Sequence, residues 1–558
     1  MRPRAGARHP GPPPVRPYSP YRRPHPSCPP HPVSPSRTTA PRTAPPPPRK
    51  RNGITVTTLL DSPAQAGAAA PPAVAVRVAT LPLPPHDPLE LFTALRERAG
   101  ETEVFLLESL EAPAQDGGTA VVGCGRLAEI RVHADRIAVD APAPLAAPLL
   151  AAVDTAGLAP LPDGSRALGA DTDVWDVLRA VQSVFRVETD AAPDTYAFGF
   201  LTTVGYGAAW HMERLPERTG ESGPDLVLAL FRDVVRYDLD AGTAERLAAT
   251  SEHFPPVAKD LVEEGLAALR PAGPLPRAPE PRAVRDSTDR DSYLESVARC
   301  LRHIGVGDVY QIQIGHRIEV DTELTPLQVY RRLRHRNPSP YMYLVPREGT
   351  TLIGASPEVL YRTEGGQLMM RPIAGTAPRS GDPAVDGPRI EALRASEKER
   401  AEHVMLVDLC RNDIGRVAVP GSLAVPSLMT VETYSHVFHL VSTVEGRLAA
   451  GQDAWSTLCA TFPAGTVTGA PKIRAMELIA DMESAPRGMY AGAVGLVDVR
   501  GWSRLALCIR TVTHDGTGYS TQSCAGIVAD SEPAAEWRET LHKMGAAYWA
   551  LTGRELAP

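Results

Sequence analysis

The stretch Ser396-Glu397-Lys398-Glu399-Arg400-Ala401-Glu402-His403 combines a helix start with closely spaced acidic residues. Ser396 and Glu399 have the spacing of a capping box, which predicts that a helix begins here. The apolar residues that follow predict its buried side; they are Val404, Met405, Leu406 and Leu409. Glu399 and Glu402 then lie one turn apart on one face of the helix. Stacked carboxylates repel each other unless solvent or a cation neutralises them.

The same pattern recurs near the C-terminus. Ser531-Glu532-Pro533 predicts a second helix start, with Glu536 and Glu539 three residues apart and Lys543 one turn later. Two acidic helix faces can share one hard cation, and oxygen ligands suit Mg²⁺ better than Zn²⁺. Solvated acidic faces are the more common explanation for this spacing alone, by roughly four to one. The spacing therefore leaves both interpretations open.

Length, composition and charge exclude several classes of protein. The chain of 558 residues has room for roughly three or four domains. Its net charge of −7 argues against a nucleic-acid partner, because phosphate contacts need a basic surface. Seven scattered cysteines without a CxxC pair indicate neither a zinc ribbon nor a disulfide scaffold. No apolar run spans a bilayer and no signal-peptide core follows the first arginines, so we expect a cytoplasmic protein without a membrane partner.

Three regions differ in composition. Residues 1–75 are rich in proline and arginine and almost free of acids, which predicts a disordered tail. A spacer or an over-long predicted start explains this tail better than contact with RNA or a membrane. Residues 76–270 are globular in composition, with strands predicted at 104–109 and 226–237 and a helix at 175–181. A proline-rich connection at 271–281 leads to a motif-dense region at 285–555.

A period-2 pattern predicts a strand at 310–320. One face carries Tyr310, Ile312, Ile314, His316, Ile318 and Val320, and the other carries Gln311, Gln313, Gly315, Arg317 and Glu319. Polar side chains on one face of a strand can line a site, although more often they face water. A helix is predicted before it at 292–304, and the last helix is predicted to pack through Trp537, Leu541, Met544, Tyr548 and Leu551.

Six motifs follow one another within residues 285–555. They are Ser356-Pro357-Glu358, Arg371-Pro372-Ile373-Ala374-Gly375-Thr376, Lys398-Glu399-Arg400-Ala401-Glu402-His403, Arg411-Asn412-Asp413-Ile414-Gly415-Arg416, Phe462-Pro463-Ala464-Gly465-Thr466-Val467-Thr468-Gly469-Ala470-Pro471-Lys472 and Ala525-Gly526-Ile527-Val528-Ala529-Asp530. This ordered set closely resembles the chorismate-binding catalytic domain of anthranilate synthase component I and its relatives. The resemblance is strong over 285–555, and weaker over 76–270, which resembles the N-terminal region of the same family.

The resemblance implies an α+β fold in which two packed antiparallel β-sheets, flanked by helices, enclose the active site. It implies chorismate as the substrate, a small dianion with a 4-hydroxyl leaving group and an enolpyruvyl ether, and Mg²⁺ as the cofactor. Glu402 and Glu539 match the metal ligands, with Glu399 and Glu536 assisting directly or through water. A divalent cation held against the ring carboxylate would neutralise charge as the ring rearranges.

The resemblance also assigns acid–base roles. Glu358 matches the catalytic acid that helps the 4-hydroxyl leave, which requires a carboxyl that stays protonated near neutral pH; burial favours this. His439 matches an active-site histidine proposed to assist leaving-group departure or a later proton transfer. Taken without the resemblance, Glu358 would be an acid of a helix or turn, and a lone histidine is usually structural.

Further matched positions are expected to bind the substrate. They are Thr376, Thr466, Tyr490 and Arg510 for its carboxylates and hydroxyl, Ala374 and Gly375 in the same motif as Thr376, Lys543 as a second cation, and the backbone N–H of Gly526. Arginine suits this role because its planar fork grips a carboxylate with two hydrogen bonds. Glycine lets the main chain approach a ligand closely.

Two positions distinguish among the reactions of the family. Relatives that add water at ring carbon 2 have a lysine base where this chain has Gln311, and a neutral amide cannot take a proton from water. Relatives that aminate carbon 4 have a lysine nucleophile where this chain has Ala374. The remaining reaction is addition of ammonia at carbon 2, followed by pyruvate elimination to give anthranilate.

Two alternatives to this reaction stay open. In the first, the enzyme belongs to specialised metabolism and releases 2-amino-2-deoxyisochorismate without eliminating pyruvate. In the second, the protein is a non-catalytic regulatory subunit that binds chorismate or tryptophan. A separate glutamine amidotransferase subunit is the expected ammonia source, in a homo-oligomer or a heterotetramer. Departures from the family pattern at Gln313, His316, Cys410 and Cys524 favour a divergent paralogue over a housekeeping enzyme of tryptophan synthesis.

Two segments resemble the tryptophan-binding segments of the biosynthetic enzymes. They contribute Glu108 and Ser109 from the first segment, and Asn337, Pro338 and Met342 from the second. A buried strand and a turn explain both segments equally well. The Arg-Tyr-Ser segment expected after the first is absent, and Gly117-Gly118-Thr119-Ala120-Val121 stands there instead. Tryptophan inhibition is therefore left open.

Overall fold

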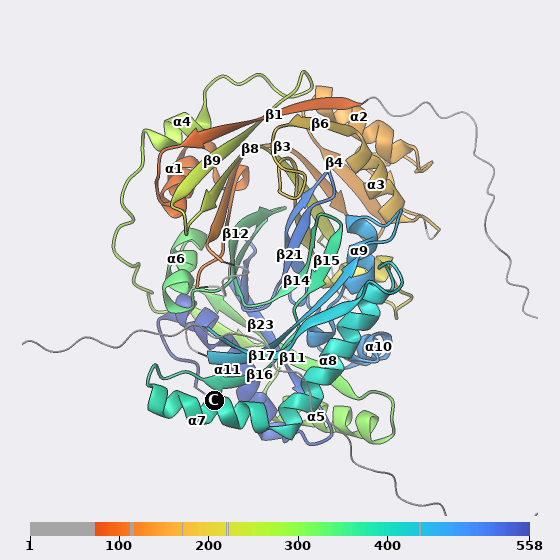
Figure 1. Cartoon of the computed structure of the whole chain (residues 1–558), viewed down its shortest axis with the longest axis vertical. Helices are drawn as coiled ribbons and strands as arrows, with labels where there is room; N and C mark the ends of the chain where they lie inside the picture. Colours follow the sequence, from red (N-terminus) through yellow and green to blue (C-terminus); the bar gives the residue numbers. More distant parts are fainter. Residues whose placement is uncertain are drawn as a thin grey trace, which may run out of the picture. The chain divides into compact units, whose positions relative to one another are not determined.

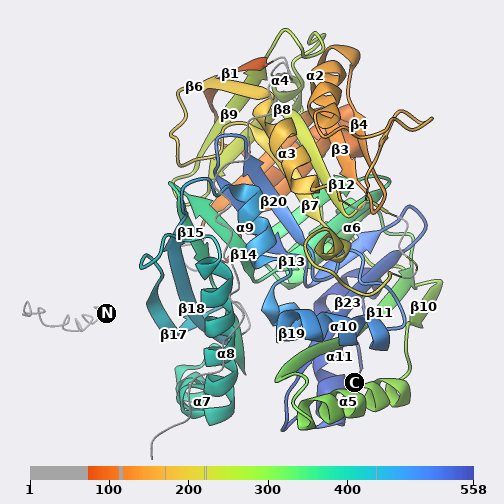
Figure 2. The same ribbon diagram turned by 90° about the vertical axis from the view of Figure 1, so that its right-hand side faces the viewer.

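The central strand of the protein is β8 (Leu226–Asp238), a run of Leu, Val and Phe that is buried along nearly its whole length. Burial on both faces is expected for such a continuous apolar strand. The computed structural model describes residues 73–111, 117–169, 171–218, 220, 223–434 and 437–557, which form one compact unit. Two branches of antiparallel strands leave β8, one through β3 (Thr119–Val132) (Figure 1) and one through β7 (Gly199–Val204) (Figure 2).

The first branch continues from β3 by successive antiparallel pairings. Its strands are β2 (Val104–Glu108), β12 (Tyr341–Arg347), β13 (Thr350–Ser356), β22 (Thr511–His514), β23 (Tyr519–Ile527) and β11 (Gln311–Asp321), with β10 (Ala283–Asp286) and β19 (Gly469–Ala470) beside β11. Strands from both predicted regions, 76–270 and 285–555, therefore share one branch.

The second branch continues from β7. Its strands are β20 (Ala493–Asp498), β21 (Ser503–Leu507), β14 (Val359–Glu364), β15 (Gln367–Met370) and β18 (Val437–Arg447), with β16 (Ile373–Pro378) and β17 (Ala424–Thr433) paired to β18. The strands β9 (Thr243–Thr250), β1 (Val74–Leu83), β6 (Phe185–Thr189), β4 (Arg136–Asp140) and β5 (Arg166–Ala167) complete the described set, in which only β1 and β6 pair in parallel.

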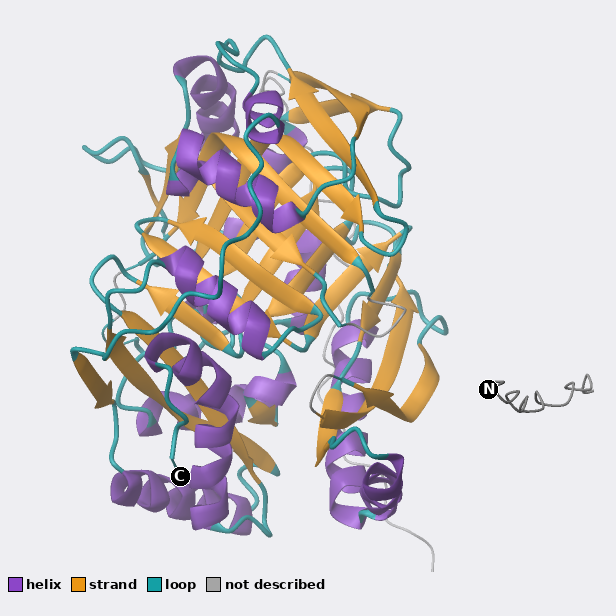
Figure 3. Ribbon diagram, turned by 90° about the vertical axis from the view of Figure 1, so that its left-hand side faces the viewer, coloured by secondary structure: helices purple, strands orange, loops and turns teal. Residues whose placement is uncertain are grey.

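Helices lie over these strands (Figure 3). They are α1 (Pro88–Ala99), α2 (Ala143–Asp154), α3 (Val174–Ser183), α4 (Leu261–Leu266), α5 (Arg290–Gly305), α6 (Pro326–Arg336), α7 (Pro383–Ala395), α8 (Glu397–Gly415), α9 (Ala454–Thr461), α10 (Lys472–Met482) and α11 (Pro533–Thr552), with short 3₁₀ turns at Glu101–Glu103, Tyr206–His211 and Gly465–Val467. The prediction of an α+β fold with antiparallel sheets and flanking helices is confirmed. No helix in the described ranges is both long and apolar enough to cross a membrane.

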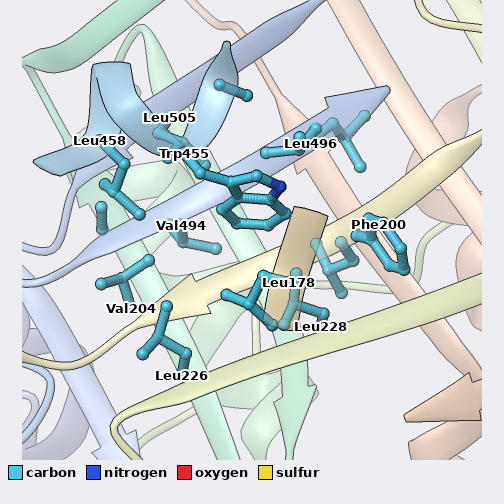
Figure 4. Close-up of a cluster of buried hydrophobic side chains, with 14 of the residues drawn as sticks. Leu178, Phe200, Val204, Leu226, Leu228, Trp455, Leu458, Val494, Leu496 and Leu505 are labelled. Carbon is cyan, nitrogen blue, oxygen red and sulfur yellow. The ribbon is translucent and has the colours of Figure 1, made fainter. Parts of the chain in front are cut away.

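Two large hydrophobic clusters hold the layers together. In one of them the indole of Trp455 is 1% exposed and lies among Leu458 of its own helix, Leu178 of α3 and Leu505 of β21 (Figure 4). Helix α11 packs in the other cluster, where Leu541, Met544 and Leu551 are buried as predicted. The two clusters fix the helices against the two branches.

The helix start at Ser396 is confirmed, but the predicted capping box is only half formed. The Ser396 hydroxyl accepts a hydrogen bond from the Glu399 N–H at 3.3 Å. The Ser396 N–H is already used by the Ala392 carbonyl at 3.0 Å, because α7 ends where α8 begins. The side chain of Glu399 therefore has no capping partner to return to and can face elsewhere.

Two other predictions need correction. Val404 is 47% exposed, because the buried side of α8 is instead formed by residues such as His403, Val407 and Cys410. Tyr310 is 71% exposed and precedes β11. The strand pattern left open whether Gln311 and Gln313 line a site or face water; both are buried, with their amides beside Gly526 of β23. The disordered tail predicted for residues 1–75 lies outside the described residues up to residue 72, and β1 begins at Val74.

Candidate active site

The far ends of the two branches carry most of the predicted site residues. In the first branch Gln313 on β11 is paired with Gly526 on β23. In the second branch Thr376 on β16 is paired with His439 on β18. Helix α11 lies against the first branch and α8 against the second (Figure 2). Residues more than 200 positions apart in the sequence thus belong to one region of the fold.

Glu358 lies between β13 and β14 and is 8% exposed. Its backbone is held by Ser356, whose hydroxyl contacts the Glu358 carbonyl at 3.3 Å and its N–H at 3.4 Å. The Thr466 hydroxyl donates to Oε1 of Glu358 at 3.1 Å. Burial raises the pKa of Glu358 to about 8, although Thr466 and the charge of Lys543 act in the opposite direction. Glu358 therefore carries a proton at neutral pH.

His439 can accept a proton, whereas Glu358 can donate one. Its Nδ1 lies 3.0 Å from the Thr376 hydroxyl and 3.3 Å from the Gly375 carbonyl. Burial lowers the pKa of His439 to about 4, and the nearby charge of Arg510 adds to this effect. The imidazole is therefore neutral, and a proton on Nδ1 satisfies the Gly375 carbonyl. This assignment follows from the hydrogen bonds and leaves Nε2 able to accept a proton.

Four carboxylates on two helices influence one another electrically. Burial, together with the charges of Glu399, Glu539 and Glu536, raises the pKa of Glu402 on α8 to about 7, although the charge of Lys398 acts in the opposite direction. Burial also raises the pKa of Glu399 and of Glu536. Burial acts upward on Glu539 too, but its ion pair with Lys543 brings the pKa below the usual value. The two acidic helix faces thus share one electrostatic environment.

Lysines provide the positive charge among these acids. The Nζ of Lys543 lies 2.7 Å from Glu539, and the Nζ of Lys398 lies 3.8 Å from Glu402. Within the described ranges, no three His, Cys, Asp or Glu side chains already form a metal-binding cluster. The oxygen-only donor set and the mutual repulsion of the acids nevertheless fit a hard divalent cation.

Gly375 allows Glu399 to approach the backbone of β16. A Cβ on Gly375 would lie 3.1 Å from Oε2 of Glu399, and the backbone of Gly375 has a φ of +81°. Both the space and the left-handed conformation favour glycine. The conformation therefore brings the acidic face of α8 close to the strand that carries Thr376.

Arg510 and Lys543 bring positive charge close to the acids. The guanidinium of Arg510 has no hydrogen-bonded partner among the described residues, and burial lowers its pKa. Its backbone has a φ of +52°, which is costly for a residue other than glycine and occurs often at functional sites. The charge of Glu539 acts on Arg510, and Tyr490 also lies within reach of the guanidinium. Lys543 also donates to the Cys524 carbonyl at 2.9 Å.

The backbone of Gly526 lies beside the side-chain amides of Gln311 and Gln313. A Cβ on Gly526 would lie 2.8 Å from Nε2 of both Gln311 and Gln313. The absence of a side chain at this position leaves room for these amides next to the main chain. Ala374, on β16, pairs with Leu440 and has no polar side chain to contribute.

Sequence reasoning assigned no role to two buried ion pairs near the site. The Nζ of Lys472 lies 3.0 Å from Asp413, which joins the start of α10 to α8. Arg487 pairs with Glu483 at 2.8 Å and lies 3.5 Å from Cys524. The i,i+4 spacing of Glu483 and Arg487 was a usable signal for the second pair. The first pair joins distant motifs and has no local signal.

The predicted effector residues are only partly brought together. Glu108, Ser109 and Met342 line one cavity, while Asn337 and Pro338 are not among its lining residues. Glu108 is also occupied, because Arg334 donates to both of its oxygens at 2.9 Å and the Tyr330 hydroxyl donates to it as well.

Comparison with known proteins identifies the family. Residues 137–548 match the family model described as chorismate binding enzyme. The chain belongs to the chorismate-binding enzyme family. This family member is 47% identical over 489 residues to the 2-amino-4-deoxychorismate synthase of Streptomyces globisporus, covering 87% of this chain and 98% of the relative.

Other relatives of this chorismate-binding enzyme are named as component 1 or I of anthranilate synthase. The protein of Streptomyces coelicolor is 42% identical over 419 residues, covering 71% of this chain and 81% of the relative. The crystal structure from Streptococcus pneumoniae superimposes with a TM-score of 0.62 at 28% identity, covering 78% of this chain and 93% of that one. The resemblance noted in the sequence is thereby confirmed.

Proposed function

We propose that this enzyme adds ammonia to chorismate at ring carbon 2, with loss of the 4-hydroxyl. The observation that carries the proposal is Glu358, a buried acid whose pKa of about 8 keeps it protonated at neutral pH. A protonated carboxyl can give its proton to a departing hydroxyl, which is poor at leaving as hydroxide. Ammonia is inferred as the nucleophile from two positions. Gln311 cannot act as a base that activates water, and Ala374 has no amine that could attack the ring.

The remaining residues have distinct roles in this proposal. The guanidinium of Arg510, with Lys543, Tyr490 and Thr466, would bind the anionic and hydroxyl groups of chorismate. Thr376 would orient the imidazole of His439, whose free Nε2 can accept a proton during the addition. Mg²⁺ held by Glu402 and Glu539, with Glu399 and Glu536 directly or through water, would neutralise the ring carboxylate.

The second part of the proposal concerns the product. The name of the Streptomyces globisporus relative describes a ring that is aminated at carbon 2 and lacks the 4-hydroxyl. This is the compound also named 2-amino-2-deoxyisochorismate, which keeps the enolpyruvyl ether. Because that relative matches over nearly its whole length, we propose that the enzyme releases this compound. Elimination of pyruvate to anthranilate is the competing outcome, supported by the names of the component 1 relatives.

Ammonia is proposed to come from a separate glutamine amidotransferase subunit. The designation component 1 of several relatives implies a second component in those proteins. Ammonium salts at high concentration would replace that subunit in the assay. Glutamine alone would then support turnover only after the second subunit is added.

The deciding experiment incubates the full chain with chorismate, Mg²⁺ and ammonium, and separates the products by chromatography with mass detection. A product that keeps the enolpyruvyl group would support the proposal. Anthranilate with equimolar pyruvate would support the competing outcome and refute the product assignment. A hydroxylated or 4-amino product would refute amination at carbon 2, and chorismate binding without any product would indicate a regulatory subunit.

A further inference from the structure

The helix that carries Glu539 is attached to β11 by the residue next to this acid. Oγ1 of Thr540 lies 2.8 Å from Nε2 of His316, and neither residue is more than 2% exposed. The other ring nitrogen, Nδ1, lies 2.8 and 2.9 Å from the two oxygens of Asp286 on β10. The imidazole also stacks on Trp537 at 4.5 Å with an interplanar angle of 15°. These contacts fix His316 in place behind one turn of α11.

The helix that carries Glu402 is attached in the same way to the other branch. Nε2 of His403 lies 2.6 Å from the Ser442 hydroxyl on β18, and both residues are 0% exposed. The same hydroxyl accepts the N–H of Met429 from β17 at 2.8 Å. On each acidic helix, the residue directly after the acid is thus joined to the strand behind it by an imidazole–hydroxyl hydrogen bond.

This placement controls how each helix is rotated about its axis. Consecutive helical residues point about 100° apart, so fixing the direction of residues 403 and 540 also fixes that of residues 402 and 539. Side chains end about 5–6 Å from a helix axis, so a rotation of roughly 10° moves a carboxylate by about 1 Å. A displacement of that size is enough to spoil a catalytic or ligand geometry.

Fixing the rotation of a helix requires directional hydrogen bonds. Packing the helix onto a sheet does not require them. Apolar side chains would hold α8 and α11 to the sheets without the cost of burying an imidazole and a hydroxyl. Apolar contacts, however, tolerate rotation and sliding better than a hydrogen bond whose angle is restricted. The two buried histidine–hydroxyl pairs therefore fix the orientation of α8 and α11, whereas packing alone would not need these buried polar groups.

We propose that His316–Thr540 and His403–Ser442 are paired positioning contacts that orient Glu539 and Glu402 toward one divalent cation shared between the two branches. This proposal rests on the proposed function, because it takes these acids as ligands of that cation. The four residues do not touch the cation; they act through the helices. His316, which departs from the usual family pattern, belongs to the α11 contact.

The test measures binding of Mn²⁺, as a probe for Mg²⁺, by electron paramagnetic resonance with and without chorismate. Thr540→Val and Ser442→Ala each remove one hydroxyl and keep the histidine. The expected result is a roughly 10- to 100-fold weaker Mn²⁺ affinity for each variant, the size found for residues that support metal ligands. Thr540→Ser restores a hydroxyl and should recover most of the affinity.

Thr457→Val is the matched control. Thr457 lies on α9, is 0% exposed and donates to the Asp453 carbonyl at 2.7 Å, so this variant also loses a buried helical hydroxyl. It should lower the unfolding temperature without changing the affinity for Mn²⁺. If Thr540→Val and Ser442→Ala behave like this control, the contacts serve stability alone and the proposal is overturned.

Failure of the proposed function gives a different result. If the unmodified chain binds no Mn²⁺ in either condition, or if Glu402→Gln and Glu539→Gln leave its binding unchanged, the assigned metal site is wrong. The positioning proposal would then be refuted along with it. A metal site lost in the glutamine variants, but unaffected by Thr540→Val and Ser442→Ala, refutes the positioning proposal alone.

Discussion

Replacement of Glu358 by Gln should lower turnover but raise the free energy of unfolding, relative to wild type, as the pH rises. Burial raises the pKa of Glu358 from 4.5 to about 8, which corresponds to roughly 5 kcal/mol of preference for the protonated form in the folded chain. The unfolded chain ionises above pH 4.5, so the wild-type protein progressively loses stability as the pH rises from 4.5 to 8. The substituted glutamine would not titrate, and its amide oxygen can still accept the hydrogen bond of Thr466.

The expected free energy of unfolding of the variant, relative to wild type, therefore rises by about 3 kcal/mol between pH 6 and pH 9. Turnover should meanwhile fall by about 10²- to 10⁴-fold, because an amide cannot replace a general acid. Chorismate binding should be largely retained. Urea unfolding at several pH values and product formation measure both effects.

Exposed Glu295→Gln on α5 is the control, with unchanged turnover. A stability difference for Glu358→Gln that is constant from pH 6 to pH 9 would refute the assignment of a buried, protonated carboxyl. Unchanged turnover would refute its role as the acid. In the wild-type enzyme, the rate should fall as the pH rises through about 8, because Glu358 loses its proton there.

Three further predictions follow from individual contacts. Gly526→Ala places a Cβ 2.8 Å from the side-chain ends of Gln311 and Gln313, which can move, so the fold should persist. The KM for chorismate should rise roughly tenfold, and an unchanged KM would show that Gly526 does not contact the substrate. Gln311→Lys introduces a base, and mass detection without ammonium should show a product hydroxylated at carbon 2, whereas complete absence of that product would weaken the nucleophile argument. Lys472→Met leaves Asp413 buried without its partner and should cost about 3–5 kcal/mol in urea unfolding, a loss that additional Asp413→Leu should largely reverse.

Local patterns in the sequence predict the acidic helices well. The start of α8 follows Ser396, α11 begins at Pro533, and β11 spans Gln311–Asp321 against a prediction of 310–320. Each of these elements has its own periodicity and end signals, so tertiary contacts were not needed to find it.

What the sequence could not show depends on neighbours. Ser396 has the residues of a capping box, but its N–H belongs to α7, a helix whose start signals, Asp382 as the cap and Pro383 after it, went unused. The burial of Gln311 depends on β19 and β23, which come more than 150 residues later. The family motifs predicted the candidate site residues, whereas the pKa shifts of Glu358 and His439 follow from burial, which only the packed structure contains.

The junction at β8 has a consequence for the dynamics of the chain. Among the described strands, every pairing path between the two branches runs through β8, so amide hydrogens there should exchange with deuterium slowest, and those of the outer strands β10 and β17 fastest. The branches would then open as two separate cooperative units, with α8 on one and α11 on the other. A ligand bound by both helices would tie the units together and slow exchange in both at once.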